Sequence, residues 1–210
     1  HSLSYEEFMR FHQLNNTFDT LLQYLRYGGM PFLPHIGLQE DLPFEYLRSV
    51  YSTILLKDVV ARENIRNVSF LENLVIYLAN NTGSLFSANN ISKYLKSQHV
   101  DMSPQITINY LRALTNAFFV HKVVRAEIEG LKIFEIGEKY YFEDIGLRNA
   151  IVGFNQRADM HKLLENAVYL HFIQQGFQVF VGKMNDKEVD FVGIRDGIKL
   201  YAQVCLTLDN

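Results

Sequence analysis

Hydrophobic residues near the N-terminus recur every three or four positions, the spacing that places side chains on one face of an α-helix. This pattern predicts two short amphipathic helices over residues 4–25, separated near Asn15-Asn16. Ser4 and Glu7 have the spacing of a capping box, which satisfies free amide groups at a helix start. The chain therefore begins with a predicted helical pair.

A stop signal and a third helix follow. The glycine pair at 28–29 and Pro31 end the second helix, because glycine tolerates positive φ and proline lacks an amide proton. Asp41 as a cap and Pro43 in the first turn predict a new helix that ends near Arg62.

Residues 69–151 show three helical patterns followed by alternating, strand-like patterns around a glycine turn, and this order predicts a winged helix. The turn at Glu129-Gly130 would be the wing, and the third helix would be the recognition helix. The expected elements are helices at about 69–79, after Ser87 and after Ser103-Pro104, strands at 120–128 and 131–136, and a short strand at 140–142.

The third of these helices carries the candidate nucleic-acid contacts. Its inward face is expected to include Ile108, Leu111, Leu114 and Phe118. Because Lys and Arg barely outnumber Asp and Glu in this part of the chain, a winged helix that binds protein stays an equal alternative. The predicted contacts are Gln105, Thr107, Asn109 and Arg112 to bases, and Lys122 and Lys132 to phosphates.

The pattern changes again after Gly153, to one helix followed by three strands. The helix is expected from about Asp159 to Gln175, and hairpin turns are expected at Asn185-Asp186 and Asp196-Gly197. The predicted strands cover residues 177–181, 187–194 and 198–206.

Composition narrows the class of protein. With 210 residues, 48% of them hydrophobic, the chain can bury one large or two small cores. A net charge of -3 argues against a strongly basic nucleic-acid protein. The single cysteine, Cys205, allows no internal disulfide and no multi-thiolate zinc site, so a cytoplasmic location is expected. No apolar run approaches the roughly 20 residues that cross a bilayer, so no membrane segment is predicted.

Several segments together resemble one known family, the AAA-type ATPases of bacteria and archaea whose C-terminal region is a domain of unknown function. The resemblance covers nearly the whole chain. The segments that carry it are YLRYGGMP at 24–31, LKDVV at 56–60, KYYFEDIGLRN at 139–149, LEN at 164–166 and EVDFV at 188–192.

The resemblance implies an α+β fold in three parts and a context in a longer protein. ATP and Mg²⁺ would belong to the full-length protein, because this sequence lacks the Gly-x-x-x-x-Gly-Lys-Ser/Thr phosphate-binding motif. The implied partners are the ATPase core of its own chain, DNA or a protein, and further copies in a homo-oligomer. The parts are a helical lid or linker remnant at 1–62, a winged helix-turn-helix at 63–155, and a partial, restriction-endonuclease-like αβββ unit of the PD-(D/E)XK type, cut short, at 156–210.

In that third part the resemblance implies a degenerate nuclease-like site. Glu165, Asp190 and Gln203 match the metal-binding positions, and oxygen ligands of this kind suit Mg²⁺ or Mn²⁺. Cys205 stands where a lysine is usual, and Lys162, one helical turn before Glu165, is the expected replacement. The mundane alternative is that these carboxylates simply face solvent.

The leading interpretation is therefore a non-catalytic accessory region of an ATPase that engages DNA or a protein partner. One alternative is a metal-dependent DNA endonuclease that uses Glu165, Asp190 and Gln203, and another is a winged-helix transcription regulator. The histidines, His161 among them, share no metal-ligand spacing and are expected to be ordinary surface or packed residues.

Overall fold

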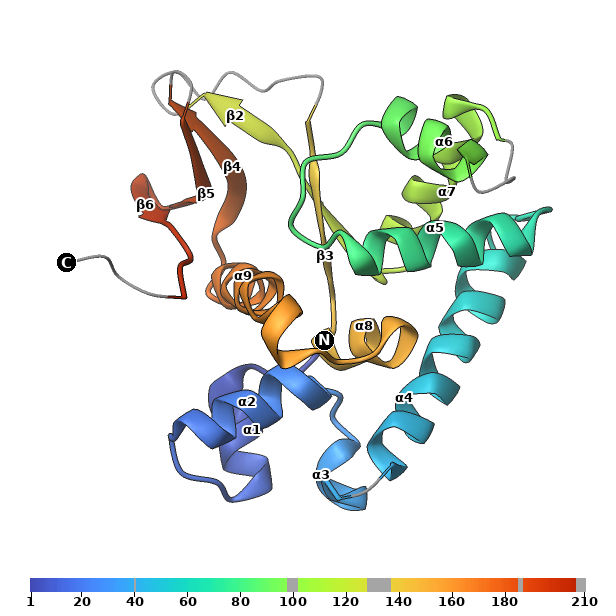
Figure 1. The fold of residues 1–210 in the computed structure, drawn as a ribbon. Coiled ribbons are helices and arrows are strands. Elements are labelled where there is room, and N and C mark those ends of the chain that lie inside the picture. Colours follow the sequence, from blue (N-terminus) through green and yellow to red (C-terminus); the bar gives the residue numbers. More distant parts are fainter. Residues whose placement is uncertain (40, 98–101, 128–136, 185–186, 207–210) are drawn as a thin grey trace. The chain divides into compact units, whose positions relative to one another are not determined.

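The computed structural model describes residues 1–39, 41–97, 102–127, 137–184 and 187–206, and its fold belongs to the predicted α+β class (Figure 1). The division at residues 62 and 155 stays a prediction. By their contacts, the residues form a helical unit (His1–Asn81, Ala88–His121 and Phe142–Phe154) and a sheet unit (Thr82–Ser87, Lys122–Tyr141 and Asn155–Asn210).

The helical unit contains most of the helices of the described chain. Its helices are α1 (Tyr5–His12), α2 (Phe18–Tyr27), α3 (Leu33–Ile36), α4 (Leu42–Thr53), the wider helix η1 (Ile54–Ala61), α5 (Val68–Asn80), α6 (Ala88–Ser97), α7 (Pro104–Asn116) and α8 (Ile145–Val152).

Local signals explain where the first helices begin and end. Ser4 and Glu7 form the predicted capping box at the start of α1, and Gly28, with φ of 74°, ends α2. Asp41 differs from the prediction, because its side chain makes no capping hydrogen bond to α4, although Pro43 lies in the first turn as expected. The short helix α3 was not predicted, since its four residues are too few to show a periodic pattern.

Helix α7 begins as predicted, with the Ser103 side chain accepting from the amide of Ile106, but its buried face differs from the expected one. Ile108 is 45% exposed and Phe118 is 67% exposed, whereas Thr107 and Tyr110 are buried with Leu111 and Leu114. The packed stripe is thus rotated around the helix, and the buried Thr107 hydroxyl is satisfied by donating to the carbonyl of Ser103.

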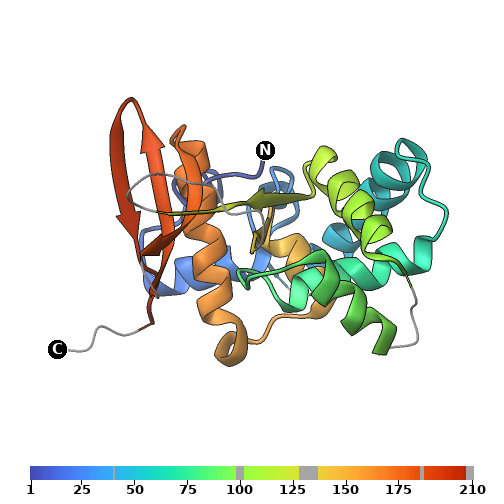
Figure 2. The ribbon, with the colours of Figure 1, turned by 90° about the horizontal axis from the view of Figure 1, so that it is seen from above.

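The sheet unit is a four-stranded sheet in the order β2-β4-β5-β6, with helix α9 packed against β4 and β5 (Figures 1 and 2). The helix followed by three antiparallel strands confirms the predicted order. The elements are β2 (Arg125–Glu127), α9 (Gln156–Gln174), β4 (Gln178–Met184), β5 (Lys187–Arg195) and β6 (Ile198–Ala202), and a separate two-stranded sheet consists of β1 (Val120–Val123) and β3 (Lys139–Phe142).

Strand β2 belongs to the larger sheet. The expected strand at 120–128 is divided into β1 and β2, and β2 pairs in parallel with β4. Ala126 of β2 is buried against Phe180 and Val192, so this short strand buries its apolar side chain in the larger sheet. The expected second strand at 131–136 and the turn at Glu129-Gly130 lie outside the described residues.

The turn between β5 and β6 confirms its prediction. Asp196 and Gly197 both have positive φ, 52° and 78°, as a two-residue turn that matches the twist of its strands requires. The turn expected at Asn185-Asp186 lies outside the described residues.

None of the described helices is both long enough and apolar enough to span a bilayer.

Candidate functional site

Two predicted metal-binding residues lie close together in the sheet unit, although one is on a helix and the other on a strand. Glu165 of α9 is 3% exposed and Asp190 of β5 is 6% exposed. Carboxylate oxygens of both residues and a ring nitrogen of His161 lie within 4.8 Å of one another. Both carboxylates are therefore buried, and the alternative hypothesis that they simply face solvent is wrong.

Lys139 joins the site although the sequence analysis did not propose it. Its Nζ lies 2.9 Å from Oε1 of Glu165, 2.9 Å from Oε1 of Glu188 and 3.6 Å from Oδ1 of Asp190. The only local signal was a lysine at the head of a strand, β3, whose other residues are aromatic. An ammonium group thus occupies the middle of three carboxylates.

Tyr141, two residues further along β3, also contacts the cluster. Its hydroxyl donates to Oε1 of Glu165 at 2.6 Å, and its ring stacks on Tyr169 of α9 with centroids 4.7 Å apart. Residues two apart on a strand point to the same side, which explains why Lys139 and Tyr141 reach one carboxylate. The β3 strand therefore supplies two donors to Glu165.

Burial and charge fix the protonation of these donors. Burial by itself would lower the pKa of Lys139, but the carboxylates of Glu165 and Glu188 outweigh it and the pKa is raised. Burial, followed by the charge of Glu165, raises the pKa of Tyr141. The site thus holds a cationic lysine and a neutral tyrosine at ordinary pH.

Gln203, the third predicted ligand, holds Asp190 in place. Its Nε2 donates to Oδ2 of Asp190 at 2.7 Å, and its Oε1 accepts from the Asp190 amide at 3.3 Å. The amide of Val204 donates to the same Oδ2 at 2.8 Å. One oxygen of Asp190 is therefore engaged by the chain that follows β6, and the other faces Lys139.

Lys162 was expected to replace the lysine that is usual at the position of Cys205. Lys162 lies 3.9 Å from Asp159 on its own helix, whereas the Nζ of Lys139 lies 2.9 Å from Glu165 and 3.6 Å from Asp190. Cys205, at the usual lysine position, is exposed. Spacing along α9 could not reveal this, because the cation comes from a strand that is distant in sequence.

Gly83 lets the chain pass close to the cluster. A Cβ atom at this residue would lie 3.0 Å from Oε1 of Glu165, and its φ of 76° also favours glycine. In the sequence Gly83 gave only the signal of a helix end. The structure shows that it also leaves space beside the carboxylate.

The predicted nucleic-acid contacts do not form one set. Gln105, Asn109 and Arg112 are exposed on α7, whereas Thr107 is fully buried and cannot reach a base. In the sheet unit, Lys122 pairs with Glu138 at 2.7 Å. Lys132 lies outside the described residues.

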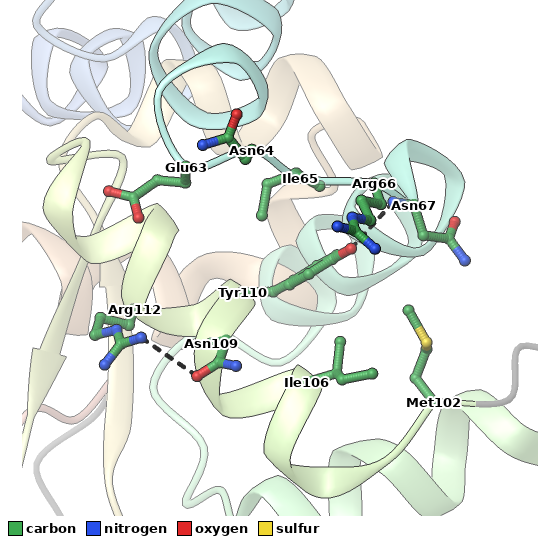
Figure 3. Close-up of a pocket in the computed structure, with 10 residues that line it drawn as sticks. All are labelled: Glu63, Asn64, Ile65, Arg66, Asn67, Met102, Ile106, Asn109, Tyr110 and Arg112. Carbon is green, nitrogen blue, oxygen red and sulfur yellow. Dashed lines mark hydrogen bonds between the residues drawn. The ribbon is translucent and has the colours of Figure 1, made fainter.

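The polar face of α7 borders an open pocket of about 480 Å³ in the helical unit (Figure 3). Asn109 and Arg112 line it from α7 and are hydrogen-bonded to each other at 3.3 Å. The hydroxyl of Tyr110 accepts from the amide of Asn67 at 3.1 Å, which fixes the segment 63–67 opposite α7. Part of the expected recognition surface therefore faces a hollow.

Two of the segments that carry the family resemblance interlock inside the helical unit. Asp144 is fully buried and accepts from the amide of Gly29 at 2.8 Å and from the amide of Leu147 at 2.9 Å. A Cβ at Gly146 would lie 1.9 Å from the carbonyl oxygen of Tyr27. Asp144, Gly146 and Gly29 therefore have a packing role, whereas Lys139 and Tyr141 of the same segment 139–149 contact Glu165.

Comparison with known proteins gives one family match and two relatives. Residues 18–158 match the model of a family described as a domain of unknown function, DUF8612. An uncharacterized protein of Haemophilus influenzae is 31% identical over 186 residues, covering 89% of this chain and 46% of the relative. The uncharacterized protein MJ1544 of Methanocaldococcus jannaschii is 27% identical over 222 residues, covering 99% of this chain and 49% of the relative. The chain thus spans about half the length of these relatives, and no solved structure matches it.

Proposed function

The chain belongs to the DUF8612 family, a domain of unknown function, and we propose on the geometry of its site that its sheet unit is a nuclease-like module that binds nucleic-acid phosphates through a divalent metal ion. The observation that carries the proposal is the proximity of Glu165 and Asp190, two buried carboxylates from different elements. Buried carboxylates are rare unless they are paired or coordinate a metal, and here Glu165 and Asp190 share the single ammonium of Lys139 with a third carboxylate, Glu188.

The donor atoms fit a divalent ion. The site has three carboxylates, those of Glu165, Glu188 and Asp190. Two cations are close to them: Lys139 contacts all three, and the guanidinium of Arg125 lies 3.9 Å from Glu188. One net negative charge remains, which favours binding of one cation. Glu165 and Asp190 would hold the ion, and when bound it would supply positive charge for a phosphate oxygen.

The other residues of the site orient these ligands. Gln203 and the Val204 amide fix one oxygen of Asp190, and Tyr141 fixes one oxygen of Glu165. Hydrogen bonds of this kind hold metal ligands in place and tune their basicity. Lys139 reduces the repulsion between the carboxylates, which keeps them close before any ion arrives.

For the whole protein we extend the proposal to the C-terminal region of an AAA-type ATPase, engaging DNA through a winged helix in the helical unit. The order α5, α6, α7 followed by β1 supports the winged helix, and the exposed Gln105, Asn109 and Arg112 support nucleic-acid contact. The relatives are about twice as long as this chain, which leaves room for an ATPase core.

Fluorescence anisotropy with a short labelled DNA duplex tests the metal-dependent part of the proposal. Mn²⁺ should raise the affinity of the 210-residue chain for DNA, and Glu165→Gln or Asp190→Asn should remove that increase. Glu127→Gln is the matched control, because Glu127 is an exposed acid of the same unit. Binding that responds equally to Mn²⁺ in all four proteins would refute the role of the two carboxylates.

A second candidate function, metal-dependent DNA endonuclease, is favoured by Lys139. A cation beside the metal ligands can stabilise developing negative charge, and one such donor is typically worth about 10²- to 10³-fold in rate. Incubation of supercoiled plasmid with Mn²⁺ checks it. Nicking by the wild type that is lost in both Glu165→Gln and Asp190→Asn would establish this activity, and equal nicking by the variants would remove it.

A further inference from the structure

His161 lies one helical turn before Glu165 on α9, with its imidazole directed at the carboxylate pair. Its Nδ1 is 3.7 Å from Oε2 of Glu165, an i,i+4 pair on one helix face. The imidazole is 47% exposed, whereas Glu165 and Asp190 are buried. His161 therefore stands at the solvent side of the carboxylates, where an ion would enter.

The hydrogen bond of the second ring nitrogen places a proton on that atom. Nε2 of His161 lies 3.1 Å from the carbonyl oxygen of Val204. A carbonyl can only accept, so Nε2 carries a proton, and Nδ1, the atom that faces Glu165, is the ring nitrogen that could bind an ion. Metal-bound histidines typically donate their other ring N–H to a backbone carbonyl or carboxylate in this way.

The distances leave a place for one ion. The donor atoms of His161, Glu165 and Asp190 lie within 4.8 Å of one another. Metal–ligand bonds of about 2.1 Å place two ligands roughly 4.2 Å apart when they lie on opposite sides of the ion and roughly 3.4 Å apart at a tetrahedral angle. A contraction of about 1 Å would thus bring all three into contact with an ion. Lys139 and Tyr141 both engage Oε1 of Glu165, which leaves Oε2 directed towards His161.

We infer that His161 is the third ligand of this ion and that the site selects a transition metal such as Zn²⁺ or Mn²⁺ over Mg²⁺. The inference rests on the proposed metal site of Glu165 and Asp190. Imidazole is a good ligand for transition metals, whereas Mg²⁺ prefers oxygen donors and keeps much of its water. The mixed nitrogen and oxygen set therefore distinguishes this site from an all-oxygen one.

Isothermal titration calorimetry of the 210-residue chain with ZnCl₂, MnCl₂ or MgCl₂ tests the inference. All proteins carry Cys205→Ser, because this exposed thiol could bind Zn²⁺ by itself. His161→Gln keeps an oxygen donor and should lower Zn²⁺ affinity at least about tenfold, with a smaller effect on Mg²⁺. His171→Gln is the matched control, since His171 is an exposed histidine of the same helix.

The outcomes separate the two proposals. Unchanged Zn²⁺ and Mn²⁺ affinity in His161→Gln, together with loss in Glu165→Gln and Asp190→Asn, would overturn the role of His161 and leave the carboxylate site standing. No binding of any of the three ions by the wild type would overturn both.

Pulsed electron paramagnetic resonance of bound Mn²⁺ gives a direct readout of the ligand. A ¹⁴N coupling in the wild type and in His171→Gln that disappears in His161→Gln would support imidazole coordination. The same coupling in all three proteins would contradict it. Circular dichroism of each variant verifies that the fold is intact.

Discussion

Nζ of Lys139 lies 2.9 Å from Oε1 of Glu165, and both side chains are only 4% exposed. An ammonium and a carboxylate that are buried together gain little net stability, because each loses its hydration. Removing one partner is different, since the remaining charge stays buried without compensation. Substitution of only one of these two residues should therefore destabilise the fold.

Lys139→Met should destabilise the chain strongly. It leaves Glu165, Glu188 and Asp190 without their central cation, and loss of one partner of a buried pair typically costs about 3–5 kcal/mol. Urea unfolding followed by circular dichroism measures the change. Lys122→Gln is the control, because its exposed pair with Glu138 should contribute no more than about 1 kcal/mol.

Divalent ions should partly restore the stability of Lys139→Met, because a bound cation replaces the lost positive charge. The measurement is the urea midpoint with MnCl₂ and after addition of EDTA. A midpoint that is insensitive to both would argue against a cation site between the carboxylates.

Gly146→Ala should be among the most damaging substitutions of the helical unit. Its Cβ would lie 1.9 Å from the carbonyl oxygen of Tyr27, and a backbone atom cannot move away cheaply. We expect a loss of about 3 kcal/mol or more in urea unfolding. Gly153→Ala meets no atom within 4 Å and should cost only the backbone strain of its φ of 84° and ψ of 168°, about 1–3 kcal/mol. Equal losses would mean that the close approach is unimportant.

Asp144→Asn should also destabilise the helical unit, although the two side chains have nearly the same shape. Asp144 accepts from the amides of Gly29 and Leu147 and from the hydroxyl of Ser2, and an amide NH₂ group cannot accept. The expected cost is about 1–3 kcal/mol. Ser2→Ala removes one donor only and should cost less. Thermal unfolding of both variants compares them.

Alkaline pH should destabilise the protein partly through Tyr51. Burial, followed by the charge of Glu72, raises the pKa of Tyr51 to about 12 from its ordinary 10.0. The unfolded chain ionises first, so the free energy of unfolding falls as pH rises from 10 to 12 and is unaffected below 10. Tyr51→Phe should therefore show a shallower loss of stability in urea titrations at pH 8, 10 and 11. Identical pH dependence in both proteins would contradict the assignment.

Much of the fold follows from short-range signals. The Ser4 capping box, the Gly28 stop and the Asp196-Gly197 turn each depend on residues within a few positions, so the sequence predicts them well. The parallel pairing of β2 could not be predicted, because its partner β4 is distant in sequence, although the expected strand at 120–128 includes the residues of β2. The buried face of α7 likewise depends on tertiary packing, which includes its contact with α6.

The candidate site, too, could be predicted only in part from the sequence. Glu165, Asp190 and Gln203 came from the family resemblance, and the structure places them together. Lys139 and His161 were missed because only the folded chain brings them to those carboxylates. The i,i+4 spacing of His161 and Glu165 was a visible signal, but it has no meaning until Asp190 is beside it.

The parallel pairing of β2 with β4 limits which fragments of the chain can be expressed separately with the carboxylate cluster intact. A polypeptide made of residues 156–210 alone would lack β2 and Lys139, leaving β4 with an open edge and three acids without their ammonium. Such open edges promote aggregation. Any separately expressed fragment that is meant to retain the carboxylate cluster must therefore also include residues 122–141.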